Sequence, residues 1–121
     1  MNTIPHNRYL IKKWACDSIT TWWGWLYIGG DLSTCEMLCR QECFPGGACV
    51  TIEPVRYIFA GGGEDGVRIG LIQYPPFPER EDDLKEKLID LGYKLAKANA
   101  QWSFSIVMPQ ETTFFSRRAR A

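Results

Sequence analysis

The sequence has no excess of either charge, no long apolar run and only one histidine, and each shortage excludes a class of function. Fourteen Lys and Arg residues balance fourteen Asp and Glu residues, so the formal net charge is zero. A protein that captures nucleic acid electrostatically usually has a basic excess, so we expect no sequence-specific nucleic-acid binding. No run approaches the roughly 20 apolar residues of a membrane span, and residues 1–7 lack the apolar core of a signal peptide. We therefore expect no membrane partner.

The single histidine, His6, lies in a polar N-terminal segment. General acid–base catalysis needs a positioned group, and a nucleophilic triad needs a base that a third residue orients. Mechanisms that combine Ser or Cys with His are therefore disfavoured. Five carboxylates could supply such chemistry, but none has a partner at a spacing that forces proximity, and we interpret them as surface or turn residues: Asp31, Glu53, Glu64, Asp65 and Glu111. The sequence predicts no catalytic residue.

The chain has five cysteines, an odd number, and no secretion signal. This combination favours reduced thiols and a cytoplasmic location. Cys35, Cys39 and Cys43 follow one side of a predicted helix, where three ligands spread over two turns do not converge on one ion. We interpret them as small buried hydrophobic side chains. The sequence therefore predicts neither a metal site nor a cofactor.

The strongest local pattern is a long β-hairpin from Ala48 to Tyr74. Residues 49–59 and 67–72 are rich in β-branched and aromatic side chains, and we expect the turn between them at Gly61–Gly66. Gly61, Gly63 and Gly66 have the G-x-G-x-x-G spacing of a phosphate loop, but a strand follows them where that motif needs a helix. Because Pro54 cannot donate to a ladder, the first arm is predicted to be an edge strand or to carry a bulge.

The other elements follow from periodicity and end signals. Residues 8–14 and 22–28 are predicted strands, separated by a turn at Asp17-Ser18. A short helix is expected to begin at the capping box of Ser33 and Glu36 and to end near Cys43. The proline-rich connector 74–78 precedes the clearest helix, residues 79–99, with an apolar stripe and an acidic first turn. Alternation predicts a strand at 102–108, and a short last strand is possible at 112–115.

This order, β-β-α-β-β-α-β, indicates an α+β two-layer sandwich with a mostly antiparallel sheet and two helices on one face. At 121 residues we expect one domain, 1–121, with mobile tails at 1–7 and 117–121. The second sheet face would then expose part of the tryptophan set. We predict a homo-oligomer that covers it.

The candidate binding residues are aromatic and cationic. Trp23, Trp25 and Tyr27 are expected on one side of their strand, with Trp22 and Leu26 on the other. Arginines beside aromatic rings suit a ligand that carries both a phosphate and a ring. The predicted ligand-binding residues are Trp23, Trp25, Tyr27, Arg56, Tyr57, Arg68, Tyr74, Arg117 and Arg118. The alternative is burial of the aromatic side chains and an unconstrained basic tail.

Three functions remain open at this point. The favoured one is a non-enzymatic oligomeric protein that binds a small anionic, ring-bearing ligand such as a nucleotide, as some phage-encoded proteins of this size sequester a signal. The second is a protein–protein interaction or inhibitor module, whose contact surface would be the aromatic face and the connector. The third is a small enzyme with a site at a subunit interface, which we place last because no acid–base group is visibly assembled.

Overall fold

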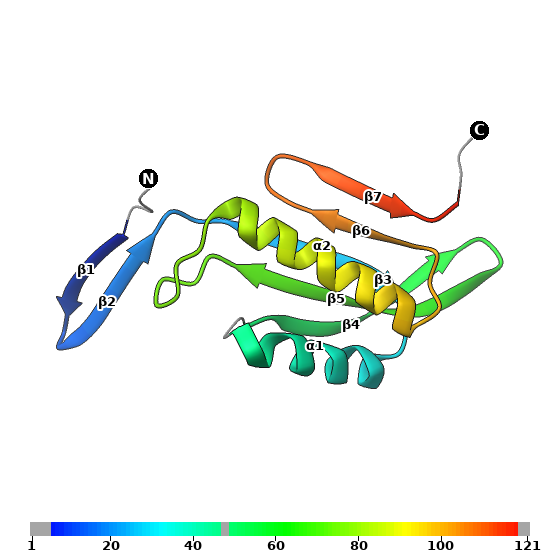
Figure 1. Ribbon diagram of the computed structural model, residues 1–121, viewed down its shortest axis with the longest axis horizontal. Coiled ribbons are helices and arrows are strands. Elements are labelled where there is room, and N and C mark those ends of the chain that lie inside the picture. The colour runs from blue at the N-terminus through cyan, green and yellow to red at the C-terminus, as the bar shows by residue number, and fades with distance from the viewer. Residues whose placement is uncertain (1–5, 47–48, 119–121) are drawn as a thin grey trace.

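The computed structural model describes residues 6–46 and 49–118 as two helices and seven strands. Five strands form an antiparallel sheet in the order β4-β5-β3-β6-β7. Their bounds are β3 Trp23–Gly29, β4 Thr51–Phe59, β5 Gly62–Ile72, β6 Ser103–Val107 and β7 Thr112–Ser116. Helices α1 (Leu32–Gly46) and α2 (Glu81–Ala98) lie against one face of this sheet (Figure 1). The predicted α+β two-layer sandwich is confirmed.

The segment from β3 to β6 runs β-α-β-β-α-β, with the first strand paired between the third and the fourth. This is the ferredoxin-like, split β-α-β arrangement. Strand β7 extends the sheet at the β6 edge, and strands β1 (His6–Ile11) and β2 (Trp14–Ile19) form a separate two-stranded sheet (Figure 1). Of the predicted tails, 1–5 and 119–121 lie outside the described residues.

The core lies between the helices and the sheet, because alternate strand residues face the helices. Leu26, Ile69 and Ile106 occupy one cross-strand row and are fully buried. Helix α2 meets this row with an apolar stripe at three- and four-residue spacing, as predicted: Leu84, Leu88, Leu91 and Leu95. Gly92 faces the Phe104 ring, where a Cβ atom would lie 2.2 Å from Phe104 Cε2. This close approach explains a glycine in the middle of the helix.

The central hairpin is present, but its turn is not at Gly61–Gly66 as predicted. β4 and β5 pair in register up to Phe59 and Gly62, so Ala60 and Gly61 make a two-residue turn. Gly61 has φ +87°, a conformation that glycine adopts without steric cost. The remaining glycines continue β5. Pro54 lies in β4, an edge strand, which confirms the first of its two predicted settings.

The prediction of one N-terminal strand at 8–14 and a turn at Asp17-Ser18 is wrong. β1 and β2 pair as a hairpin, and the turn is at Lys12 and Lys13, with φ of 49° and 68°. A two-residue turn of this kind, with positive φ at both central positions, normally uses Asn or Gly there. Two lysines give no such signal, whereas Asp17 gives one and yet pairs with Arg8 within the ladder.

Helix α1 also begins before the predicted cap. The Asp31 carboxylate accepts hydrogen bonds from the Thr34 backbone N–H at 2.9 Å and the Thr34 hydroxyl at 3.1 Å. Asp31 is therefore the N-cap in place of Ser33, and the helix runs to Gly46, beyond the predicted end at Cys43. Cys35 and Cys39 are buried against the core, as the hydrophobic interpretation expects. Neither helix is long and apolar enough, within the described chain, to cross a membrane.

Candidate functional site on the open face of the sheet

The face of the five-stranded sheet that lies away from α1 and α2 gathers aromatic and charged side chains. Alternate residues of β3 to β7 point to this side, which we call the open face. Its members include Trp23, Trp25, Tyr27, Glu53, Tyr57, Glu64, Arg68, Ile72, Ser105, Val107 and Phe114. Trp22 and Leu26 are buried on the helix side, whereas Trp23, Trp25 and Tyr27 are half-buried here, which confirms the predicted division of this strand.

Arg68 is the centre of this face. It lies opposite Tyr27 on one neighbouring strand and opposite Glu53 on the other. Its Nε donates to Glu53 Oε1 at 2.8 Å, and its guanidinium carbon lies 4.2 Å from the centroid of the Trp25 ring. Hydrogen bonds with Tyr27 and Glu53 raise the pKa of Arg68, so the group stays cationic. The arginine thus lies over an indole with its charge partly neutralised.

A second group lies towards the turn of the β4–β5 hairpin. Tyr57 and Glu64 are cross-strand partners, next to the glycine pair Gly29 and Gly66. A Cβ atom at Gly29 would lie 1.9 Å from Glu64 Oε1, and one at Gly66 would lie 2.4 Å from Tyr57 Cε2. The two glycines therefore let the ring and the carboxylate lie directly on the sheet backbone. Burial, followed by the charge of Glu64 and then Tyr27, raises the pKa of Tyr57, so its hydroxyl stays protonated at neutral pH.

The other end of the open face is hollowed. An open cleft of about 630 Å³ lies between the root of β2 and the ends of β3 and β5. Indole side chains line it, and Trp25 belongs both to this cleft and to the Arg68 cluster. Its other lining residues are Asp17, Ser18, Ile19, Thr21, Trp22, Trp23, Ile72, Gln73 and Pro75. Aromatic walls continuous with a cationic centre are suited to a ligand that has a planar ring and charged groups.

A smaller cavity of about 150 Å³ lies on the helix side, between α1 and α2. Its floor is apolar, from Val50, Leu71 and Leu88, and the ion pair of Lys94 with Glu42 closes part of its rim at 2.6 Å. Burial is the main cause that raises the pKa of the Cys43 thiol on its wall. The described residues hold no group of three or more His, Cys, Asp or Glu side chains placed to bind a metal.

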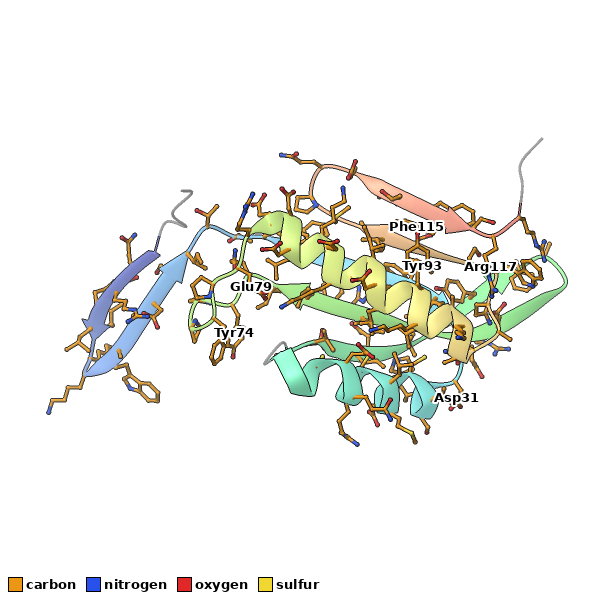
Figure 2. The ribbon with its side chains drawn as sticks, viewed as in Figure 1. Asp31, Tyr74, Glu79, Tyr93, Phe115 and Arg117 are labelled. Atoms are coloured by element: carbon orange, nitrogen blue, oxygen red, sulfur yellow. The ribbon has the colours of Figure 1, made fainter. Side chains whose placement is uncertain are left out.

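The predicted ligand-binding residues fall into two sets. Five of them share the open face: Trp23, Trp25, Tyr27, Tyr57 and Arg68. The other four lie elsewhere. Arg56 pairs with Asp65 at 2.8 Å and lies on the opposite side of β4 from Glu53 and Tyr57. Tyr74 and Arg117 lie towards opposite ends of the molecule, as their labels in Figure 2 show.

The C-terminal arginines contact Trp102. The guanidinium carbons of Arg117 and Arg118 lie 5.3 Å and 5.6 Å from the centroid of its ring. Arg117 also donates to the Gln101 carbonyl at 2.6 Å. These contacts hold both residues beside the start of β6 rather than over the Arg68 cluster.

Glu53 and Glu64 are the two site residues that sequence reasoning passed over. Each was interpreted as a surface or turn residue because no sequence spacing links it to a partner. The hairpin register links each of them to a partner, because it places Glu53 opposite Arg68 and Glu64 opposite Tyr57. Gly61, Gly62 and Gly63 are consecutive, so the glycine that such a turn needs does not by itself select Ala60–Gly61, and the sequence carried no unambiguous signal for this register.

The open face therefore defines a class of site: an aromatic platform with one arginine, two carboxylates and two tyrosines on a small α+β sheet. No protein-family model matches the chain, and no curated protein matches its sequence. Solved structures do match its fold. A phage SAM lyase in the apo state is similar with a TM-score of 0.60 and 14% identity, over 83% of this chain and 92% of that chain.

The phage SAM lyase in complex with S-methyl-5'-thioadenosine is similar with a TM-score of 0.58 and 14% identity, over 84% of this chain and 93% of that chain. These likenesses show that this chain has a fold used by an enzyme. They overturn the expectation of a non-enzymatic binding protein, and with it the expectation that the chain is not an enzyme. The third function considered from the sequence, a small enzyme, is the one that the comparisons favour.

Proposed function

We propose that this chain is a small phage lyase that acts on S-adenosylmethionine (SAM) or a closely related sulfonium nucleoside. The observation that carries the proposal is the likeness of its fold, over most of both chains, to a phage SAM lyase in two states. The chemistry of the open face is consistent with this substrate class.

The substrate has a planar adenine, a positive sulfonium, an ammonium group and a carboxylate. Trp25 offers an aromatic face for the ring or for the sulfonium, because cations are attracted to the face of an indole. Glu64 offers a carboxylate to a positive group. The guanidinium of Arg68 is a forked donor for the carboxylate of the substrate. To bind it, Arg68 either keeps its hydrogen bond to Glu53 at the same time or gives that bond up. This fit replaces the anionic ligand expected from the sequence, because Glu53 and Glu64 offset the arginine.

Formation of S-methyl-5'-thioadenosine from SAM requires cleavage of the bond between sulfur and the four-carbon amino-acid group. The electron pair of that bond goes to the sulfur, which changes from a sulfonium to a neutral thioether. The carbon that was bonded to sulfur loses this electron pair. Either the carboxylate of the same fragment attacks that carbon and closes a lactone, or the neighbouring carbon loses a proton and an alkene forms. The first route needs no base, and the second would use a carboxylate such as Glu64. Both routes need a dry, preorganised site.

We further propose that the protein is a homo-oligomer with this site at a subunit interface, and that it works in the cytoplasm. The open face carries exposed apolar side chains such as Ile72 and Phe114, and a partner subunit would cover them. The free cysteines of the chain are compatible with a reducing compartment.

The experiment is direct. Purified protein is incubated with SAM at pH 7.5, and the products are followed by liquid chromatography and mass spectrometry. We expect S-methyl-5'-thioadenosine together with a lactone or an unsaturated amino acid, at a rate well above that of substrate in buffer. Matched reactions with S-adenosylhomocysteine, which lacks the sulfonium charge, are expected to give no product. No turnover of SAM, combined with no binding of SAM or S-methyl-5'-thioadenosine in calorimetry, would refute the proposal.

A further inference from the structure

The N-terminal hairpin projects from the molecule as an arm. We use this name for residues 6–19, which comprise β1, the Lys12–Lys13 turn and β2. The ladder of β1 is made with β2, and the arm extends beyond the end of the five-stranded sheet with its turn directed away from it (Figure 1). A two-stranded hairpin alone is at best marginally stable in water. An arm of this kind therefore needs a surface to lie on.

The arm is apolar on both of its sides. Tyr9, Ile11 and Trp14 point to one side and are 49%, 51% and 77% exposed, and Leu10 on the other side is 71% exposed. Given that aromatic side chains bury roughly 150–250 Å² each, the three residues on the first side together expose on the order of 350 Å² of apolar surface. Contact of this side with a surface of similar size would bury about 700 Å² in total, and mutual exchange of two arms would bury about 1,400 Å², which is within the range of stable interfaces.

The chain itself has an apolar surface on which an arm can pack. At the root of the arm, the open face presents Trp23, Trp25 and Ile72 around the cleft of about 630 Å³. The root of the arm itself forms one wall of this cleft, through Ser18 and Ile19, while its turn points the other way. The exposed end of an arm can therefore cover such a face only on another molecule.

The charge distribution favours a second copy of this chain as the partner. The arm contains Arg8, Lys12 and Lys13 against the single acid Asp17, so it carries an excess of two positive charges. Because the net charge of the chain is zero, the remainder carries an excess of two negative charges. The opposite net charges thus favour contact between the arm of one copy and the body of another.

We propose that the arm of one copy packs across the open face of a second copy, with Trp14 seated against Trp23 and Ile72 of that copy, so that Trp25 and Arg68 are left to the ligand. The arm thereby shields the apolar end of the open face from water. This inference goes beyond the proposed lyase activity, and its test uses no substrate, so the two proposals can fail separately.

The first test places p-benzoylphenylalanine at position 14 in an equimolar mixture of ¹⁴N- and ¹⁵N-labelled full-length protein. After illumination, we expect cross-linked peptides that join position 14 of one isotope to strand β3 or β5 of the other. Cross-links only within one isotope, or only to α1 or α2, would overturn the proposal.

The second test uses the variants Trp14→Ser and Leu10→Ser, with Met37→Ser as the matched control. Met37 is 63% exposed on α1 and lies outside the arm and the open face. Native mass spectrometry and sedimentation velocity are expected to show a loss of subunit association of at least tenfold for Trp14→Ser, on the side that packs, and no change for the control; Leu10→Ser, on the other side of the arm, is expected to have a smaller effect than Trp14→Ser. Circular dichroism verifies that the body of each variant folds.

An anionic membrane or a nucleic acid could also attract a basic, aromatic hairpin, so both are offered as competitors. Vesicles with 30% phosphatidylserine and a 20-base-pair DNA duplex are added while Trp14-dependent fluorescence and subunit count are measured. We expect neither to bind the assembled protein through the arm. A monomer whose arm binds either of them would overturn the assignment to a second copy.

Discussion

At the residue scale, two arginines of one hairpin have different surroundings. Arg56 and Arg68 each pair with a carboxylate across β4 and β5, but the side chains lie on opposite faces. Arg68 also stacks on Trp25 at 4.2 Å, whereas Arg56 belongs to the exposed end of the hairpin. The same residue type on the same hairpin is therefore part of the candidate site in one case and of the solvated surface in the other.

This difference gives a matched pair of variants. Arg68→Met is expected to lower turnover or ligand affinity by roughly tenfold to a hundredfold, because a hydrogen bond from a charged group contributes about 1.5–3 kcal/mol. Arg56→Met is expected to change either quantity by less than about twofold, since an exposed pair contributes little. Kinetics with SAM and calorimetry with S-methyl-5'-thioadenosine measure both. Equal losses in the two variants would show that the site does not lie on the open face.

Also at the residue scale, burial against the core raises the pKa of the Cys39 thiol to about 12 from its usual value of 9.0. The folded state thus holds this proton more tightly than the unfolded chain does. The resulting stability is fully present below pH 9 and is lost as pH rises towards 12. We expect the Cys39→Ala variant to show a flatter decline of unfolding free energy with pH, by up to about 1.4 kcal/mol per pH unit. Urea titrations of both proteins at pH 8, 9 and 10 measure it, and identical slopes would contradict the assignment.

At the scale of the element, a long apolar stripe predicted one helix accurately, whereas the signals at the start of the other helix did not fix where it begins. Helix α2 was predicted at 79–99 and runs from Glu81 to Ala98, because 18 residues carry one apolar stripe and an acidic first turn. Helix α1 was misplaced at its start, since Asp31 and Ser33 are both good caps. Only the position of the preceding strand decides that Asp31 is the residue whose carboxylate reaches the Thr34 N–H.

That choice of cap can be tested. Asp31→Ala is expected to destabilise the protein by about 1 kcal/mol, with a range of roughly 0.5–2 kcal/mol, because the Thr34 N–H and hydroxyl lose their acceptor. Ser33→Ala, within the first turn, is expected to change the unfolding free energy by less than about 0.5 kcal/mol. Denaturant unfolding followed by circular dichroism compares the two. A larger loss for Ser33→Ala would restore the cap predicted from the sequence.

At the scale of the whole molecule, one sheet face is covered by helices and the other is not. A 121-residue chain with two helices can cover only one side of a five-stranded sheet, so the aromatic residues of the second side stay at its surface. The predicted homo-oligomer follows from this arrangement and stays a prediction.

If the protein is an oligomer, its thermal stability depends on its concentration. Association that binds only folded chains adds about 2.7 kcal/mol of stability for a hundredfold rise in concentration. For a pair of chains of this length we expect Tm to rise by about 5 °C between 1 and 100 μM. Differential scanning calorimetry measures it, with Trp14→Ser as a comparison that should show a smaller rise. A Tm independent of concentration in the wild-type protein would indicate a monomer.

The sequence by itself determined the elements that have a repeating pattern: the apolar stripe of α2, the alternation of β6, the division of β3 into a Trp22 side and a Trp23 side, and hence the α+β class. Such patterns follow from the geometry of one helix or one strand, so they can be read locally. The tertiary structure alone decided the register of β4 against β5, which brings Glu53 to Arg68 and Glu64 to Tyr57, because pairing across strands depends on where a two-residue turn closes. It also separated Arg56, Tyr74 and Arg117 from the site, since distances between elements are set by how the layers pack.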